Sequence, residues 1–416
     1  MMTPLALPRR TFVVMMAAAC AAAASACRSP APARQPTAAS VPSLTEREIR
    51  ERDIEFYKAR ADRDPTGAAD LAHLGALYLE RARDTGDPRD ALLAEQVARR
   101  SMRNREPHNM AAHQILSSSL LSQHRFDEAL VEAKHVRDSD PSSAPARAGV
   151  AEIEMELGRY DSASVGFASL DGAQNDLAVA PRLARWSEIR GHTDAARRYM
   201  RGALSVAQHE PTLPREQLAW FWLRSGDIEL RAENLAGADS AYRAGLSANP
   251  GDYRVLAAMA RLAMARHQFG DAAKYGEESI ATMLDPATLG ILSDAYGALG
   301  DTARAADYAR VLDVAVSKQP GAYHRAWSLF LLDHNQRVDV VARKIREEMK
   351  TRRDIYAYDL LAWSLHKQGR DVQAQAAMAT ALSQGTRDPL LVQHEAAITA
   401  ALSKAGTAAH NTEMAK

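Results

Sequence analysis

"FDEALVEAKHVRDSDP", residues 126–141, is an amphipathic run that starts on an aromatic residue, carries Ala129 early and closes on a proline. Similar runs return along the chain, as in "LAGADSAYRAGLSANP" (235–250) and "DVQAQAAMATAL" (371–382). Each has a small residue at the same early position, and these residues are Ala129, Ala163, Ala196, Ala238, Ala272, Ala305 and Ala374. Such runs are typical of helices with one buried stripe.

The spacing of these alanines is regular. From Ala129 to Ala305 the successive spacings are 34, 33, 42, 34 and 33 residues. The next spacing, 69 residues to Ala374, leaves room for one more unit with Val341 in the equivalent position. A fixed period of this length indicates stacked units that bury their apolar faces only against their neighbours. It excludes two unrelated globular domains, and the low aromatic content of 6% favours helices over strands.

A partner run precedes each alanine-bearing run. It carries bulky, Leu-Gly-like and aromatic positions, as in Leu74-Gly75 with Tyr78, Leu116 with Leu120, Trp222 with Gly226, Leu292 with Tyr296 and Leu361 with Leu365. The combined pattern resembles the tetratricopeptide repeat (TPR) over about residues 67–390, in nine units of which the third, fourth and eighth depart from it. The resemblance implies an all-α TPR solenoid, a right-handed superhelix of antiparallel helix pairs.

The pattern predicts the organisation of the whole chain. We expect a signal peptide at 1–26, a lipidated or disordered tether at 27–43, a capping helix at 44–66 and a disordered tail at 404–416. TPR units 1–4 take up 67–211, and units 5–9 with a C-terminal capping helix take up 212–403. A capping box, Ser43 or Thr45 with Glu46 or Glu48, marks the first helix. The longer join "AQHEPTLP" (207–214) suggests a hinge between the two subarrays.

The N-terminus has the features of an export signal. Arg9 and Arg10 precede an apolar run shorter than the ~20 residues that span a bilayer, and small residues follow it. A transmembrane anchor is the lesser alternative. The stretch from Pro8 to Val14 resembles a twin-arginine signal, and an ordinary positively charged n-region explains it equally well.

Cys27 stands at the end of this signal. Ala24-Ser25-Ala26-Cys27 resembles the lipobox of bacterial lipoproteins, although Ala24 occupies a position that is usually leucine. No cysteine follows Cys27, so it has no partner for an intramolecular disulfide, which favours lipidation. Simple cleavage before Cys27 stays open. Residues 28–43 carry four prolines and almost no large apolar side chains, which is typical of an extended tether.

Several classes of function lack their residue patterns. Lys+Arg and Asp+Glu both number 52, with no basic stripe for nucleic acid. The sequence holds no metal-binding, dinucleotide or P-loop motif, so we expect no metal and no cofactor. Ser364 to Lys367 formally matches S-x-x-K, but its companion motifs are missing and the four residues end a repeat helix. We therefore expect no enzymatic activity.

The resemblance also implies a groove that is lined by the first helix of each pair. Its register assigns partner contacts to Trp220, Asp227, Arg254, Arg261, Asp294, Tyr323, Phe330, Tyr356, Asp359, Trp363 and His366. The earlier groove positions are mostly small (Ala69, Ala72, Ala111, Ser118, Ala148), so the C-terminal half is favoured as the binding face. Aromatic residues and arginine often anchor interfaces, although several of these aromatics can equally pack between units.

Two kinds of partner fit this groove. The first hypothesis is a scaffold or adaptor tethered to a membrane outside the cytoplasm through Cys27, holding other envelope proteins or peptide segments. The alternative is binding of an extended carbohydrate or peptidoglycan strand, for which exposed aromatics are equally suited.

Overall fold

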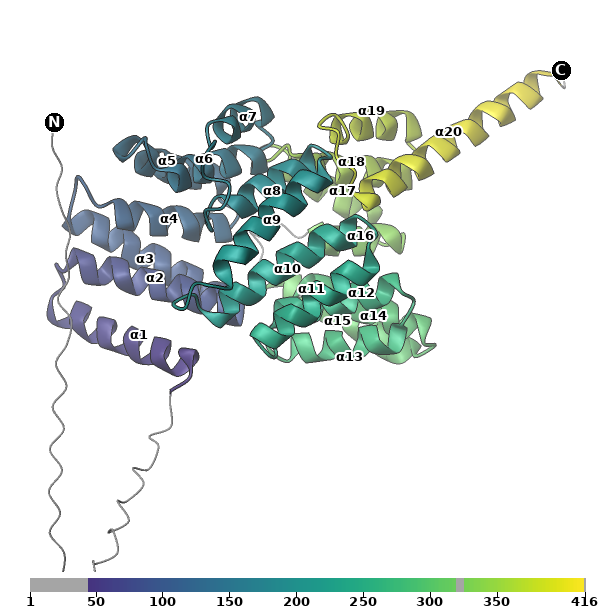
Figure 1. Cartoon of the computed structure of the whole chain (residues 1–416). Coiled ribbons are helices and arrows are strands. Elements are labelled where there is room, and N and C mark those ends of the chain that lie inside the picture. The colour runs from purple at the N-terminus through teal and green to yellow at the C-terminus, as the bar shows by residue number, and fades with distance from the viewer. Residues whose placement is uncertain (1–43, 319–324, 415–416) are drawn as a thin grey trace, which may run out of the picture. The chain divides into compact units, whose positions relative to one another are not determined.

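Paired helices make up the molecule from Ala68 onward (Figure 1). The computed structural model describes residues 44–318 and 325–414, and every regular element within those ranges is a helix. Helix α1 (Glu46–Arg63) precedes nine pairs, and α20 (Pro389–Met414) follows them. The pairs are α2 (Ala68–Thr85) and α3 (Pro88–Asn104), α4 (Met110–Ser122) and α5 (Phe126–Ser139), α6 (Ala144–Glu156) and α7 (Tyr160–Ala168), α8 (Ala180–Ile189) and α9 (Thr193–Ala207), α10 (Arg215–Arg231) and α11 (Leu235–Ala248), α12 (Tyr253–Ala265) and α13 (Phe269–Ile280), α14 (Pro286–Ala298) and α15 (Thr302–Ser317), α16 (Arg325–Asp333) and α17 (Val338–Glu348), and α18 (Ile355–Lys367) and α19 (Asp371–Ala381).

The prediction of an all-α solenoid of helix pairs is confirmed. Successive first helices also touch each other across the intervening second helix, as α2 does with α4 and α12 with α14. The first helices therefore form one shared inner layer. The predicted signal peptide, the tether with Cys27 and the groove residue Tyr323 lie outside the described residues. Helix α20 extends to Met414, through most of the predicted tail 404–416.

The alanine period corresponds to the points where paired helices cross. Ala129, Ala238 and Ala374 are each 0% exposed. The Oγ of Ser117, on the first helix of its pair, donates to the Ala129 carbonyl at 3.0 Å, which only a close approach of the two helices permits. Ala305 is the exception among the seven, since it is only half-buried.

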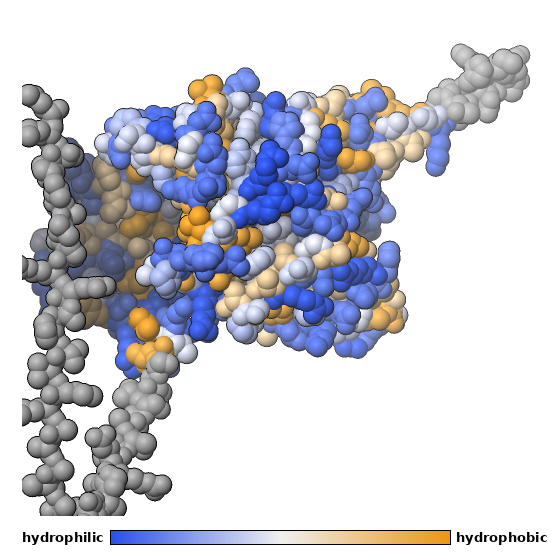
Figure 2. All heavy atoms as spheres, in the orientation of Figure 1, coloured by the Kyte–Doolittle hydropathy of each residue, from blue (hydrophilic) through white to orange (hydrophobic). Residues whose placement is uncertain are grey.

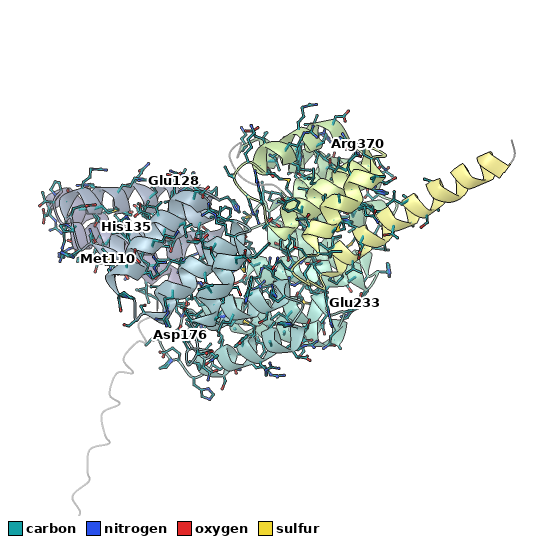
Figure 3. The ribbon with its side chains drawn as sticks, turned by 90° about the horizontal axis from the view of Figure 1, so that it is seen from above. Met110, Glu128, His135, Asp176, Glu233 and Arg370 are labelled. Atoms are coloured by element: carbon teal, nitrogen blue, oxygen red, sulfur yellow. The ribbon has the colours of Figure 1, made fainter. Side chains whose placement is uncertain are left out.

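The turn inside each pair repeats with the same period. A residue in the left-handed backbone region stands five positions before each periodic alanine, and these residues are His124, Gly158, Gly191, Glu233, His267, Gly300 and Gly369. Their positive φ values reverse the chain between the two helices, as at Glu233 after α10 (Figure 3). The sequence period is therefore also a period of the backbone.

Polar side chains cap the N-termini of several helices. The predicted capping box forms at Thr45, whose Oγ1 accepts from the Glu48 N–H at 3.2 Å while its own N–H donates to the Glu48 carboxylate at 2.8 Å. Asp87, Asn109, Ser143, Asp285 and Asp354 cap later helices in the simpler way, through one side-chain oxygen. On the face shown in Figure 2, hydrophilic side chains predominate and hydrophobic ones are scattered among them.

Helices far apart in the sequence meet in this fold. The peptide N–H of Ile355 donates to the Tyr160 hydroxyl at 2.8 Å, and Arg190 donates to the Gln384 side chain at 2.8 Å. The carboxylate of Glu156 lies 3.2 Å from the Arg352 guanidinium. The third and fourth pairs thus contact the start of α18 and the segment before α20. We call these interactions the closing contact.

Candidate functional site

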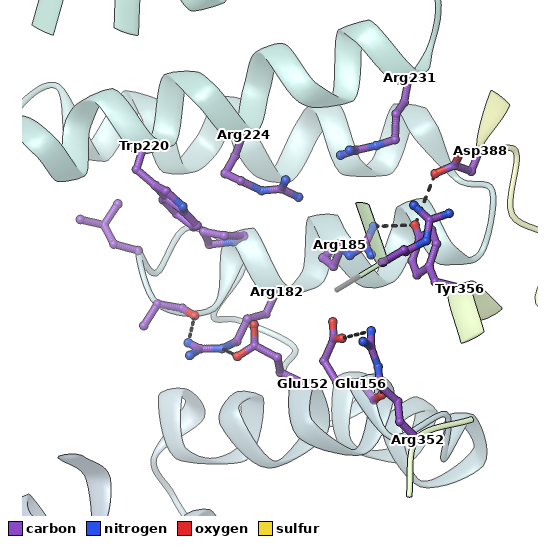
Figure 4. Close-up of a pocket in the computed structure, with 14 residues that line it drawn as sticks. Glu152, Glu156, Arg182, Arg185, Trp220, Arg224, Arg231, Arg352, Tyr356 and Asp388 are labelled. Atoms are coloured by element: carbon purple, nitrogen blue, oxygen red, sulfur yellow. Dashed lines mark hydrogen bonds and ion pairs between the residues drawn. The ribbon is translucent and has the colours of Figure 1, made fainter. Parts of the chain in front are cut away.

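A cavity of about 680 Å³ lies beside the closing contact (Figure 4). Its walls come from α6, α8, α10, α16 and α18, together with the segments that lead into α8, α18 and α20. Six arginines line it, and we call it the arginine cavity. Its lining residues are Glu152, Glu156, Leu177, Ala178, Pro181, Arg182, Arg185, Trp220, Arg224, Arg231, Arg325, Arg352, Tyr356 and Asp388.

Two of the three carboxylates in the lining are held by arginines of the same lining. Arg182 donates to Glu152 at 2.6 Å, and Arg352 donates to Glu156 at 3.2 Å. Burial raises the pKa of Glu156 above its usual value, although Arg185 and Arg352 oppose the shift. Glu152 and Glu156 are therefore already paired with Arg182 and Arg352, and the other arginines of the lining contact different groups.

Helix α10 supplies a wall in which cations outnumber anions. Arg224 contacts Asp227 at 3.0 Å and Glu188 at 3.4 Å, and Arg231 donates to Glu188 at 2.7 Å. Arg261, from α12, contacts the same Asp227 at 3.1 Å. Burial opposes ionisation of Asp227, but Arg261 and Arg224 outweigh it and hold its pKa below the usual value. Three guanidiniums thus share two carboxylates.

Tyr356 lies between two arginines from different pairs. The guanidinium carbons of Arg185 and Arg325 are 5.0 and 4.9 Å from the centre of its ring, in cation–π geometry. Its hydroxyl accepts from Arg185 at 3.0 Å and faces Asp388 at 3.4 Å. In Figure 4, Arg224 and Arg231 point into the space from α10, opposite Glu152 and Glu156.

A second hollow, of about 660 Å³, lies on the first helices of the first two pairs, α2 and α4. Small side chains form much of its floor, and these are Ala69, Ala72, Ala76, Ala111 and Ser118. A third hollow of about 830 Å³ shares Leu79, Arg83 and Ser118 with it and extends to Tyr253 and Met283. Together the two hollows form what we call the inner groove.

The predicted contact residues on α10 and α12 lie in ion-pair networks or against the arginine cavity. Trp220 lines that cavity, and Asp227 and Arg261 belong to its charged wall. Arg254 is bound to Asp252 at 2.6 Å and lies 3.6 Å from Glu216. Asp227, Arg254 and Arg261 therefore already have ion-pair partners within the chain, whereas Trp220 borders the open cavity.

The predicted residues on later helices differ in accessibility. Asp294 is exposed and lies 3.1 Å from His334, whereas Phe330 is 8% exposed and belongs to the hydrophobic core. Asp359 is 0% exposed, because Arg325 at 2.7 Å and His394 of α20 at 2.6 Å cover it.

The aromatic ring of Trp363 is covered as well. It stacks on His394 with 4.0 Å between ring centres and on His366 with 5.0 Å, and its indole N–H donates to Asp333 at 2.7 Å. His366 in turn contacts Asp371 at 2.6 Å. A sugar ring has no free indole face at Trp363 in this arrangement, which weakens the carbohydrate hypothesis.

The arginines of the cavity were missed in the sequence, although one signal for them exists. Arg224 and Arg231 each follow a predicted groove residue by four positions, at Trp220 and Asp227, and so lie on the same face of α10. Arg325 and Arg352 have no such signal, because only the closing contact brings them to the cavity. Across 44–318 and 325–414, no group of three or more His, Cys, Asp and Glu side chains is arranged to hold a metal ion, and no helix is long and apolar enough to cross a membrane.

Comparison with known proteins supports the repeat pattern. Residues 120–184 match the profile of the Tetratricopeptide repeat family. The match runs from the end of α4 into α8 and includes two of the periodic alanines, Ala129 and Ala163. Among curated proteins, none matches the chain.

Solved structures with similar folds are remote in sequence. PilW, a widely conserved type IV pilus biogenesis factor, is 20% identical over 54% of this chain and 99% of its own, with a TM-score of 0.41. The Cut9–Hcn1 hetero-tetramer of the APC/C is 11% identical over 85% and 87%, with a TM-score of 0.33. A tetratricopeptide repeat protein from Parabacteroides merdae is 15% identical over 78% and 98%, with a TM-score of 0.28.

Proposed function

We propose that this protein is a non-enzymatic scaffold that holds extended segments of partner proteins in its inner groove. Arrays of tetratricopeptide repeats typically serve protein–protein interaction, and their stacked pairs create long concave binding surfaces. The observation that carries the proposal is the hollow on α2 and α4, which shares the lining residues Leu79, Arg83 and Ser118 with the neighbouring hollow.

Small residues leave room in this groove for a partner segment. At Ala69, Ala72 and Ala111 a side chain ends at Cβ, so the space above the helices stays empty. Leu79 and Ile115 offer apolar contact, and Arg83 at one end offers charge. A partner segment fills space here, whereas Phe330 and Trp363, predicted contact residues of the C-terminal half, are buried in its hydrophobic core. Asp294, an exposed member of the predicted set, is a further proposed contact.

We further propose that the scaffold works outside the cytoplasm, tethered to a membrane by lipid on Cys27, and that its partners are envelope proteins. The export signal and the lipobox-like stretch support this location. Mass spectrometry of the mature N-terminus tests it. A diacylglyceryl-modified Cys27 is expected, and an unmodified Cys27 or an uncleaved N-terminus would contradict the tether.

Site-specific photocrosslinking in the native cell tests the scaffold itself. A photoreactive amino acid replaces Ala111 in the groove, and the matched control carries it at Val165, which is 74% exposed on α7. We expect a discrete protein adduct from position 111 and none from position 165. Equal labelling at both positions, or no adduct from the groove, would count against the proposal.

A further inference from the structure

Arg185 differs from the other arginines of the cavity. Arg182, Arg224, Arg231, Arg325 and Arg352 each lie within ion-pair distance of a carboxylate. Among the residues that the structure describes, no carboxylate oxygen lies within 4.0 Å of the Arg185 guanidinium. Its one hydrogen bond to a described residue goes to the hydroxyl of Tyr356. Arg185 is half-buried on α8, so its charge is only partly solvated.

The carboxylates of Glu156 and Glu188 attract Arg185 without contacting it, and each is already paired with another arginine. Glu188 and Asp227 already serve Arg224, Arg231 and Arg261. Arginine stays protonated at every relevant pH, and the six arginines of the lining outnumber its three carboxylates, which are Glu152, Glu156 and Asp388. A partly buried charge without a direct ion pair costs free energy, and a bound anion in contact with it would recover part of that cost.

We propose that the arginine cavity binds a ligand with several oxyanion groups, carboxylate or phosphate, and that Arg185 holds one of them. A guanidinium matches such groups through paired N–H donors, and four of the five donors of Arg185 are not used by Tyr356. The volume of about 680 Å³ suits a small molecule or a few residues of an acidic peptide. Trp220 offers a flat apolar wall beside the charges.

Occupancy of this site is linked to the closing contact. Arg185 comes from the fourth pair, whereas Tyr356 and Arg325 come from the ninth and eighth. A ligand that touches both groups binds only when the pairs are together, so it stabilises the folded, closed array by mass action. The proposal does not depend on partner binding in the inner groove.

Calorimetric titration of the full chain at constant ionic strength tests the proposal. The probes are citrate, inorganic pyrophosphate and a hexapeptide of glutamate, and the most tightly bound probe identifies the source of the oxyanions. We expect saturable binding of at least one probe that weakens about tenfold or more in Arg185→Gln. The affinity for the same probe should stay unchanged in Arg198→Gln, which removes an exposed arginine of α9 outside the cavity.

Tyr356→Phe is a second variant, which removes only the hydroxyl that holds Arg185. It keeps the site testable if Arg185→Gln does not fold. Weaker binding in Tyr356→Phe supports the site. The proposal is overturned if no probe binds saturably to the wild-type chain, or if the tightest probe binds both cavity variants as well as the wild type.

Discussion

The Arg352 guanidinium and the Glu156 carboxylate lie 3.2 Å apart, although 196 positions separate them in the sequence. Arg352 also donates to the backbone carbonyl of Glu156 at 3.3 Å and to Asp354 at 2.5 Å. A stack of repeats has contacts mainly between neighbours, so this long-range contact adds a constraint that the stack alone does not have. The arginine cavity exists because of it.

Gly158→Ala should break this contact. Gly158 has φ +77°, and a Cβ there would overlap the carbonyl of Arg353 on the far segment. Gly300 has φ +82° at the equivalent turn, with nothing near its added Cβ. In urea unfolding, both alanine variants should lose about 1 kcal/mol to backbone strain, and Gly158→Ala about 1–3 kcal/mol more through overlap. Equal losses in the two variants would show that the closing contact is absent in solution.

Glu233→Gly should stabilise the protein. Glu233 has φ +58° at the turn where four other pairs have glycine, and its exposed side chain makes no hydrogen bond or ion pair with any described residue. Relief of the left-handed strain exceeds the extra chain entropy of glycine, for a gain of up to about 1 kcal/mol. Thermal melting measures it. A lower melting temperature would contradict the assignment of this turn.

Much of the fold could be predicted because it is periodic. Ala129, Ala238 and Ala374 mark helix crossings that recur along the sequence, and the turn residues follow the same spacing. Thr45 and Glu48 formed a local cap that needed no knowledge of distant segments. Interactions within one helix pair, or between adjacent pairs, thus produce a pattern that is visible in a single sequence.

The site was less predictable because its residues meet only through distant contacts. Gly158 and Gly369 end similar helices in similar local sequences, yet only Gly158 is pressed against another segment. The repeat register placed Asp359 in the groove, and nothing in it indicated that His394 of α20 would cover that carboxylate. The small residues Ala69 and Ala111 looked uninformative, although they create the hollow.

Overpacking a crossing point tests the period directly. Ala238 is 0% exposed at the contact between α10 and α11, and leucine there has no free volume to occupy. We expect Ala238→Leu to lower the free energy of unfolding by about 1–3 kcal/mol. The half-buried Ala305 should accept leucine with a loss below about 1 kcal/mol. Chemical denaturation measures both, and a harmless Ala238→Leu would rule out a close crossing.

Glu348 should make stability depend on pH. Burial raises its pKa to about 7, although Lys344 and Arg352 oppose the shift. Because the folded state holds this proton more tightly than the unfolded state does, the contribution of Glu348 to stability falls as pH rises from about 4.5 to 7. Glu348→Gln removes the effect. The melting temperature of the variant minus that of the wild type should therefore increase over this range.

Glu347→Gln is the matched control for this pH series. Its carboxylate is on the neighbouring residue, and its side chain is 71% exposed. We expect the corresponding difference for Glu347→Gln to vary little with pH. If the difference for Glu348→Gln were equally flat, the carboxyl of Glu348 would not be buried in solution.

The helix-pair array closes on itself, and crosslinking across the closing contact tests this closure most directly. Arg190 and Gln384 meet at 2.8 Å, so cysteines at these two positions replace them in a full chain whose Cys20 and Cys27 are changed to serine. A short bifunctional maleimide should join the two cysteines within one native chain, rapidly and almost completely, and only slowly in denaturing urea. A native chain that crosslinks no faster than the denatured one would contradict closure, and with it the arginine cavity.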